Sequence, residues 1–271
     1  METTEYAEKA KMEERVAFEI EQNAFRGLVK MLARLGSEMI LFSASDRALR
    51  LFAVNEDHAM LVMGYINRES FRKYEISNEH AFAIDVKDLN SVLALSDKKS
   101  MVHFSKIGEK IHMESDDGFS QEFTISLEGT TIRVPGIQYE HGVLVSLKGL
   151  TETATYADDV GSDIIKLLKD RNVLAVTFNR GKTLLEKNLE IEREKDTKLI
   201  ADGVFGTYSP EYLKSALKGM YQLCGDVPVM VRMNMDGKEM APLKISFRAD
   251  INADNNKAIR GYALIAPRTP N

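Results

Sequence analysis

The side chains best placed for acid–base chemistry are Asp46, Asp57 and His58, which lie in neighbouring predicted turns. Two carboxylates and an imidazole could in principle form a general acid–base site. Aspartates are also ordinary turn residues, because their side chains accept hydrogen bonds from the nearby backbone. The turn interpretation explains both aspartates without catalysis. A carboxylate-dependent hydrolase or nuclease is therefore retained only as an alternative function.

The remaining reactive side chains give weaker signals. The histidines, none at close helical spacing for a metal, are residues 58, 80, 103, 112 and 141. Cys224 is the one cysteine, so a disulfide framework and a multi-cysteine zinc site are excluded. Asp158 and Asp159 are adjacent on a predicted helix and are expected to lie on a solvated face. No P-loop, dinucleotide fingerprint, nucleophile elbow or HExxH motif occurs. We predict no catalytic residue, metal or cofactor.

Basic side chains recur at helical spacing in two places. Arg26, Lys30 and Arg34 form a stripe on one predicted helix, separate from its apolar stripe. Lys214 and Lys218 have the same spacing on a helix in the second half. Such residues either solvate an exposed helix face or face the phosphates of a nucleic acid. Because the net charge is −5, nucleic-acid binding would have to come from local patches of this kind.

The first half of the chain is predicted to contain two helices among short strands. One helix begins at Asn23, the expected N-cap, and ends near Leu35, and a shorter helix covers Asp88–Ser96. Alternating apolar residues predict strands at 16–20, 38–43, 48–54, 58–66, 81–86, 100–105, 110–115 and 119–125.

The second half repeats this order of elements. A helix is predicted from Thr151 to Val160, without a basic residue, and another starts with Ser209 as cap and Pro210 in its first turn. Strands are predicted at 143–147, 183–192, 203–208, 229–234, 242–248 and 261–266, with a hairpin at 164–178. The segment AFAIDVKDLNSVLAL aligns with FGTYSPEYLKSALKG, which supports a duplication.

Between the halves, Ser126–Gly142 contains Pro135 and several glycines, and it has no regular period, so it predicts an extended connector. The fold class is α+β, with two tandem similar domains that each combine antiparallel sheets with two helices on one face. The predicted divisions are an N-terminal extension (1–14), a first domain (15–125), the connector (126–142) and a second domain (143–271). No apolar run is long enough for a membrane span, and no secretory signal occurs, so we expect an intracellular protein.

Five stretches together resemble the proliferating cell nuclear antigen family of DNA sliding clamps, of the archaeal and eukaryotic type. They are LRLFAVNEDHAMLVMG (49–64), VPGIQYEHG (134–142), GVFGTYSPEYLKSALK (203–218), APLKISF (241–247) and YALIAPR (262–268). The resemblance implies the DNA clamp fold, in which three subunits close a pseudo-six-fold ring around double-stranded DNA. It implies a polymerase processivity factor that tethers replication and repair proteins and is not an enzyme. The basic helix stripes would then contact phosphates without reading sequence.

The resemblance also implies a surface beneath the connector for short client peptides with a hydrophobic and aromatic plug. Its residues would be Val54, His58, Ala59, Leu61, Val134, Gly136, Ile137, Pro242, Leu264, Ala266 and Pro267. Val54, Leu61 and Leu264 are equally well explained as core residues. The implied partners are DNA polymerase, the clamp loader and other proteins that carry such peptides.

Clamps of this family join subunits by pairing an edge strand of one subunit with an edge strand of the next. By position, these strands are Phe119–Ser126 and Thr183–Ile191. The implied interface residues are Phe119, Gln121, Phe123, Ile125, Leu185, Lys187, Leu189 and Ile191. A homotrimer is the leading expectation. The acidic helix at 151–160 departs from the family pattern, so one subunit of a heterotrimeric clamp remains an alternative. Two further alternatives are a checkpoint-type clamp and a monomeric peptide-binding module that has lost ring closure. The expected location is the nucleoid of an archaeal cell or the nucleus of a eukaryotic one.

Overall fold

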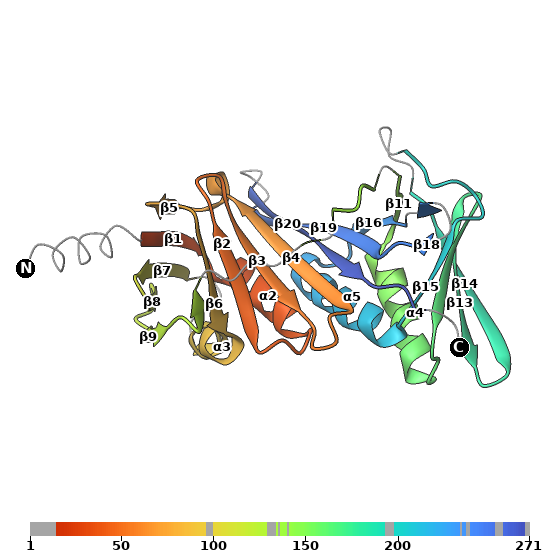
Figure 1. Ribbon diagram of the computed structural model, residues 1–271, viewed down its shortest axis with the longest axis horizontal. Helices are drawn as coiled ribbons and strands as arrows, with labels where there is room; N and C mark the ends of the chain where they lie inside the picture. The colour runs from red at the N-terminus through yellow and green to blue at the C-terminus, as the bar shows by residue number, and fades with distance from the viewer. Residues whose placement is uncertain are drawn as a thin grey trace, which may run out of the picture. The chain divides into compact units, whose positions relative to one another are not determined.

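The computed structural model describes residues 15–95, 100–128, 134, 136–139, 141–192, 198–233, 235–236, 239–252 and 257–268. The predicted N-terminal extension lies outside these residues. The chain divides into two compact units (Figure 1). Unit 1 contains the described parts of 1–53, 63–133 and 249–260, and unit 2 contains those of 54–62, 134–248 and 261–271. Each unit therefore includes a short segment from the other half of the sequence, which a division into contiguous halves does not anticipate.

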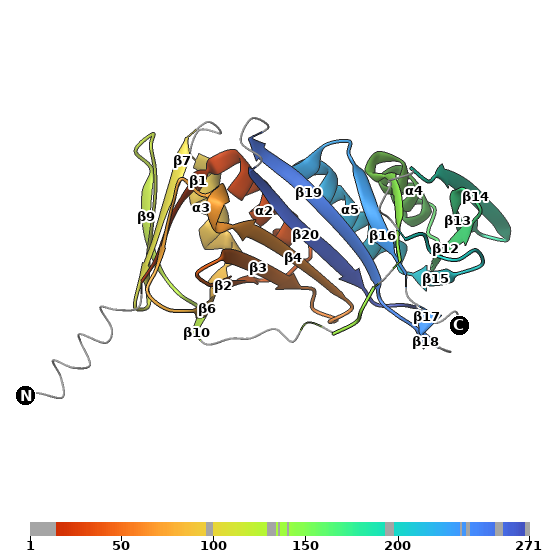
Figure 2. The ribbon, with the colours of Figure 1, turned by 90° about the horizontal axis from the view of Figure 1, so that it is seen from above.

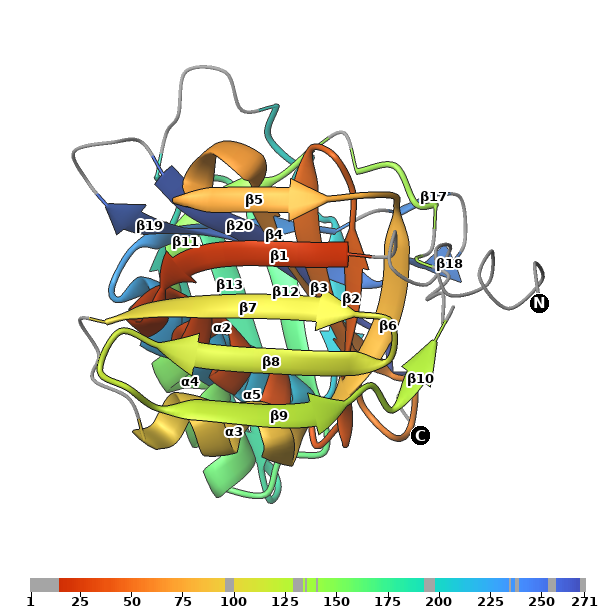
Figure 3. The same ribbon diagram turned by 90° about the vertical axis from the view of Figure 1, so that its left-hand side faces the viewer.

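Unit 1 contains a five-stranded antiparallel sheet in the order β5-β1-β7-β8-β9, which Figure 3 shows face on. Its strands are β1 (Arg15–Glu21), β5 (Lys73–Ile76), β7 (Met101–Ile107), β8 (Lys110–Ser115) and β9 (Ser120–Thr124). The register places Phe18 opposite Phe104, and their rings stack at 4.5 Å between centroids. This aromatic pair anchors the buried face of the sheet.

The other sheet strands of unit 1 follow the order β10-β6-β2-β3-β4. They are β2 (Met39–Ala44), β3 (Ala48–Val54), β4 (Met60–Asn67), β6 (His80–Asp85) and β10 (Leu127–Glu128). Two helices, α2 (Gln22–Ala33) and α3 (Val86–Leu95), and the short 3-10 helix η1 (Arg68–Ser70) complete the unit. Helix α2 buries Phe25, Leu28, Val29 and Leu32, as its apolar spacing predicts.

Unit 2 repeats this combination of elements. Its four-stranded sheet, in the order β14-β13-β12-β15, contains β12 (Ile165–Asp170), β13 (Val173–Arg180), β14 (Thr183–Glu190) and β15 (Phe205–Tyr208). A second set of strands, in the order β20-β19-β16-β11, contains β11 (Val143–Ser146), β16 (Pro228–Arg232), β19 (Leu243–Asn252) and β20 (Lys257–Ile265). The strands β17 (Met235–Asp236) and β18 (Glu239–Met240) form a separate hairpin. Helices α4 (Leu147–Asp159) and α5 (Pro210–Cys224) pack on each other along one face of the second set (Figure 2).

The predicted α+β class with antiparallel sheets and paired helices is thus confirmed, and several local predictions are corrected. Helix α2 begins at Gln22, so Asn23 lies inside the helix and is not its N-cap. The backbone amide of Gln22 donates to the Ser100 carbonyl at 3.0 Å. Helix α4 begins at Leu147, because the Ser146 hydroxyl accepts from the Gly149 amide at 3.0 Å. It therefore includes the exposed Lys148.

The predicted connector begins as a strand. Leu127 and Glu128 form β10, which pairs with β6, and Ser126 donates to the Ala83 carbonyl at 2.8 Å. Strand β5 was also missed, because its sequence KYEI is too short for a clear alternation. Ser209 occupies the N-cap position of α5, but its side chain makes no capping hydrogen bond. Among the described residues, no helix is long and apolar enough to cross a membrane.

Candidate functional site

Two segments far apart in the sequence, 54–62 and 261–268, lie side by side in unit 2. The Ala266 amide donates to the Ala59 carbonyl at 2.8 Å. The turn before Ala59 is closed by Asn55, whose side-chain oxygen accepts from the Met60 amide at 2.7 Å. The structure therefore brings the predicted partner-binding residues of the first half next to the Ala-Pro pair near the C-terminus.

The predicted partner-binding residues differ in accessibility. His58, Val134 and Gly136 are exposed. The half-buried members are Val54, Ala59, Ile137, Pro242, Ala266 and Pro267. Leu61 and Leu264 are only 9% and 6% accessible, so they mainly stabilise the sheet. A bound peptide would contact the members of the first two groups.

The turn that carries His58 is held by helix α5. The Tyr212 hydroxyl on α5 donates to the Asp57 carboxylate at 2.5 Å, and this hydrogen bond raises the pKa of Tyr212. His58 follows with a positive φ of 54°, and its side chain is exposed at the tip of the turn. Tyr212 was not among the predicted site residues, since nothing in its spacing indicates a bond to a turn so distant in the sequence.

The proposed acid–base residues have separate structural partners. Asp57 accepts from Tyr212 in unit 2, whereas Asp46 belongs to unit 1. Burial raises the pKa of Tyr74 to about 12, and the charge of Asp46 adds to this shift. The described part of the chain contains no group of three or more His, Cys, Asp and Glu side chains that could hold a metal ion. The hydrolase alternative therefore gains no support from this geometry.

The connector is attached to unit 2 through Tyr139. Its hydroxyl donates to the Pro242 carbonyl at 2.6 Å, and the Lys244 ammonium lies 5.5 Å from its ring centroid. Burial raises the pKa of Tyr139 to about 12. Tyr139 thus fixes the segment that contains Gly136 and Ile137 beside strand β19. The sequence signal for this role is that Tyr139 is the single Phe, Tyr or Trp of the connector.

The basic residues of α2 lie away from its apolar stripe. Arg26 is half-buried, and Lys30 and Arg34 are exposed. On α5, the Lys214 ammonium instead lies 2.7 Å from an Asp158 oxygen and 2.8 Å from an Asp159 oxygen. These bonds raise the pKa of Lys214 and lower that of Asp159. Asp158 and Asp159, which were expected on a solvated face, are therefore ion-pair partners of Lys214. Of the two predicted lysines on α5, only Lys218 has no carboxylate bonded to it among the described residues.

The two predicted interface strands are edge strands in the described sheets: β9 in unit 1 and β14 in unit 2. Gln121, Phe123 and Ile125 are half-buried, and the Ser91 hydroxyl on α3 donates to Gln121 at 2.9 Å.

On or just beyond β14, Leu185 and Ile191 are half-buried and Lys187 is exposed. Leu189 is 6% accessible and lies against Gly149 of α4. Leu189 is therefore a core residue of its own unit. Two large apolar side chains near these edges are exposed: Phe119 is 42% accessible and Leu184 is 67% accessible. Leu184 was not among the predicted interface residues.

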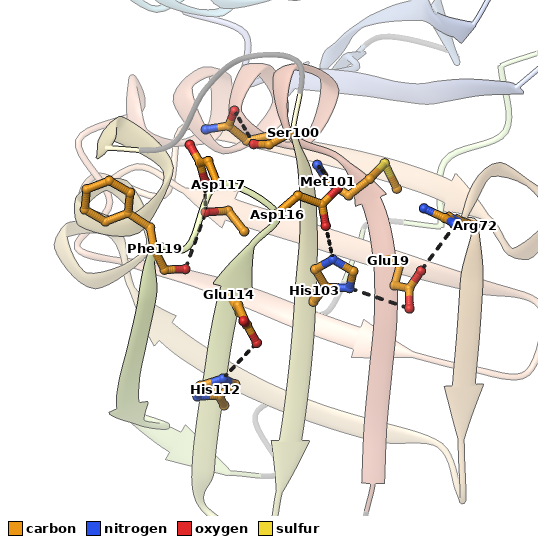
Figure 4. Close-up of polar contacts among 12 residues, drawn as sticks. Glu19, Arg72, Ser100, Met101, His103, His112, Glu114, Asp116, Asp117 and Phe119 are labelled. Atoms are coloured by element: carbon orange, nitrogen blue, oxygen red, sulfur yellow. Dashed lines mark hydrogen bonds and ion pairs between the residues drawn. The ribbon is translucent and has the colours of Figure 1, made fainter.

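The outer face of the five-stranded sheet carries a polar cluster around His103 (Figure 4). Its two ring nitrogens lie 2.6 Å from Asp116 and 3.5 Å from Glu19. Arg72 lies 3.8 Å from the other oxygen of Glu19. The hydrogen bond to His103 lowers the pKa of Asp116. His103 is thus a surface histidine with satisfied polar partners.

Comparison with known proteins shows what the chain is similar to. Residues 19–115 match the family described as proliferating cell nuclear antigen (PCNA), N-terminal domain. The DNA polymerase sliding clamp of Thermoplasma volcanium is 22% identical over 231 residues, which cover 84% of this chain and 88% of that protein.

Two solved structures share the fold of this chain. A. fulgidus PCNA bound to the C-terminal region of FEN-1 has a TM-score of 0.76 at 12% identity, over 94% of this chain and 99% of that chain. A PCNA2–PCNA3 complex from Sulfolobus tokodaii has a TM-score of 0.72 at 18% identity, over the same shares. The chain is thus similar to DNA polymerase sliding clamps along most of its length, and it has the fold of solved PCNA structures.

Proposed function

We propose that this protein is a DNA sliding clamp, a ring that encircles double-stranded DNA and tethers DNA polymerase and other replication and repair proteins. The observation that carries the proposal is the similarity to a DNA polymerase sliding clamp along 84% of the chain. We assign 15–125 and 143–271 as the two clamp domains and 126–142 as the connector. The protein acts by topological linkage and is not an enzyme, so it needs no catalytic residue, metal or cofactor. It works where the DNA is, in the nucleoid of an archaeal cell or the nucleus of a eukaryotic one.

Ring closure follows from the two edge strands. Strand β9 of one subunit pairs with β14 of the next, which satisfies the backbone groups that both edges leave unpaired within a single chain. Because the two surfaces differ, the contact is head-to-tail and closes into a ring when the rotation is three-fold. The exposed side chains of Phe119 and Leu184 join the predicted contact set, and Leu189 supports β14 from behind. A homotrimer is the simplest assembly; a heterotrimer is the alternative, as in the S. tokodaii structure of two different clamp chains.

The DNA-facing residues are Arg26 and Lys30 on α2, Arg34 at the C-cap of α2, and Lys214 and Lys218 on α5. Contacts to phosphates hold the duplex without a preferred register, which suits a protein that must slide. Lys214 contributes least, because its charge is balanced by Asp158 and Asp159. Client peptides, including those of polymerase and clamp loader, bind over the accessible residues of the turn at His58, the connector and the Ala266-Pro267 pair.

Two measurements test the proposal. Light scattering should give a species near three times 30.5 kDa for a homotrimer. Protein loaded onto a nicked circular plasmid should be retained in buffer of high salt and should be lost when the plasmid is cut, because the linkage is topological. A stable monomer at every concentration, together with equal retention on circular and linear DNA, would refute the ring. Nuclease activity abolished by Asp46→Ala or Asp57→Ala would instead favour the hydrolase.

A further inference from the structure

Strands β16, β19 and β20 of unit 2 present cationic and aromatic side chains on one face. Alternate residues of β19, including Leu243 and Ile245, are buried, so Lys244 and Ser246 project from the opposite face. On β20, Ala263 and Ile265 are buried and share one face, so Tyr262 and Leu264 alternate with them on the opposite face. This face is the one on which Tyr139 attaches the connector.

Lys244 lies between two tyrosine rings. Its ammonium is 4.4 Å from the ring centroid of Tyr262 and 5.5 Å from that of Tyr139. Both distances are within the range of cation–π attraction. Burial lowers the pKa of Lys244, and the nearby charge of Arg232 lowers it further. Lys244 is thus a partly buried cation that lies against two aromatic rings.

A second cation lies directly beside Lys244. Arg232 on β16 is the cross-strand partner of Lys244, and its guanidinium donates to the Ser246 hydroxyl at 2.9 Å. Burial lowers the pKa of Arg232 too. Within the described ranges, neither cation forms an ion pair with a carboxylate. Like charges directly opposite each other on two strands are destabilising, and an anion placed between them would remove this cost.

We propose that Arg232 and Lys244 form a carboxylate-binding subsite that recognises an Asp or Glu of a client peptide next to its hydrophobic plug. The inference rests on the proposed peptide surface and names one determinant of its specificity. The subsite adjoins that surface, because the half-buried Pro242, just before β19, is two residues from Lys244 and accepts the hydrogen bond from Tyr139. The Arg232 fork can bind a carboxylate through two N–H groups, and Lys244 adds a point charge. The tyrosine rings limit access of water and so strengthen the attraction.

Unit 2 offers a matched control for this subsite. Lys166 lies 4.5 Å from the ring centroid of Phe205, a cation–π contact like that of Lys244 with Tyr262. It is on β12 of the four-stranded sheet and has no cross-strand cation, since its partners are Thr177 and Thr207. Substitution of Lys166 removes one positive charge and one cation–π contact without touching the proposed subsite.

The test is fluorescence anisotropy with two labelled synthetic peptides. Both carry one aliphatic and two aromatic residues as the plug, and they differ only by Glu or Gln in the positions that flank it. We expect wild-type protein to bind the Glu peptide about tenfold more tightly than the Gln peptide. Arg232→Gln and Lys244→Gln should each remove most of this preference, which is measured as the ratio of the two peptide affinities within the same variant. Lys166→Gln should retain the full preference, and added salt should reduce it in all proteins that show it.

The outcomes separate the two levels of the proposal. Binding of the Gln peptide without any preference for Glu would overturn the subsite and leave the peptide surface standing. A Glu preference that persists in both Arg232→Gln and Lys244→Gln would also overturn the subsite. If wild-type protein binds neither peptide, the peptide surface itself fails, and the subsite with it. The comparison of two peptides on wild-type protein needs no variant, so a variant that folds poorly does not weaken the test.

Discussion

The basic residues of α2 and α5 share a helical spacing but differ in their electrostatic surroundings. On α2, Lys30 is exposed and has no ion-pair partner among the described residues. On α5, Lys214 is held between Asp158 and Asp159 of the neighbouring α4. A lysine whose charge is already balanced attracts a phosphate less strongly, because the field of the two carboxylates opposes it. Two helices that look equivalent in a duplicated sequence therefore present different potentials, and the difference comes from the adjacent helix.

The largest effect should come from the buried sides of these helices, where the two units are alike. Leu28 on α2 and Leu217 on α5 are both completely buried. Replacement of either by Ala removes apolar contacts and leaves a cavity, so each should lower the free energy of unfolding by about 3 kcal/mol. Denaturant unfolding of Leu28→Ala and Leu217→Ala measures this. A cost below about 1 kcal/mol in one helix only would mean that the apolar stripes are not equivalent.

The exposed sides should behave differently in DNA binding. Charge reversal in a Lys30→Glu/Arg34→Glu variant should weaken binding to a short duplex about tenfold to hundredfold, and the salt dependence should become shallower. Lys214→Gln should change the affinity by less than about threefold, since that charge is already balanced. Fluorescence anisotropy over a range of salt concentrations gives both quantities. Equal losses for the two helices would contradict the contrast drawn between them.

Removal of the acidic partners should make α5 resemble α2. In an Asp158→Asn/Asp159→Asn variant, Lys214 loses both ion pairs and becomes available to phosphate, and two negative charges disappear. We expect duplex affinity to rise about threefold to tenfold and its salt dependence to become steeper. The control is the same double variant combined with Lys214→Gln. A gain of the same size in that control would show that the effect comes from net charge alone rather than from release of Lys214.

The smallest effect concerns the pH dependence of the stability of the fold, to which the ion pairs of Lys214 with Asp158 and Asp159 contribute. The hydrogen bond from Lys214 lowers the pKa of Asp159 in the folded protein. Such a carboxyl stabilises the fold above its unfolded pKa of about 3.9, and the contribution is lost as the pH falls through the lower folded value. The raised pKa of Lys214 acts in the opposite sense: its contribution is present below about pH 10.4 and is lost as the pH rises through the folded value.

Thermal unfolding measured from about pH 6 to about pH 3 checks the acid side. The Asp158→Asn/Asp159→Asn variant should lose slightly less stability over this range than wild type. Because Asp159 is exposed, the difference should be small. An identical acid profile in both proteins would mean that the ion pairs do not contribute to stability in solution.

Much of the fold could be predicted from local pattern. The strands at Ala48–Val54 and Lys110–Ser115 have the predicted bounds, since alternation of apolar residues is strong there. The N-terminus of α2 could not be predicted, because the Gln22 amide is satisfied by Ser100, a residue on another part of the chain. Strand β10 was hidden for the same reason: it exists only because β6 offers an edge to pair with.

The candidate site divides in a similar way. The resemblance to a family named the turn at His58 and the Ala266-Pro267 pair, but not Tyr139, Tyr212 or Arg232, whose contacts join segments far apart in sequence. Leu189 shows the reverse error, because strand position suggested an interface residue and packing against Gly149 makes it core. Burial of one face of an edge strand depends on what lies behind it, and that neighbour is not encoded nearby.

The sequence by itself determined most of the secondary-structure elements, the duplication, the two basic helix stripes and the resemblance to sliding clamps, because these depend on residue type and on spacing within one segment. The tertiary structure decided which charges are balanced and which are not. Lys214 is neutralised by α4, whereas Arg232 and Lys244 lie together without a carboxylate in the described chain. Coulomb interactions depend on distance in space and on burial. Those two quantities are set only when strands and helices from distant parts of the chain come together.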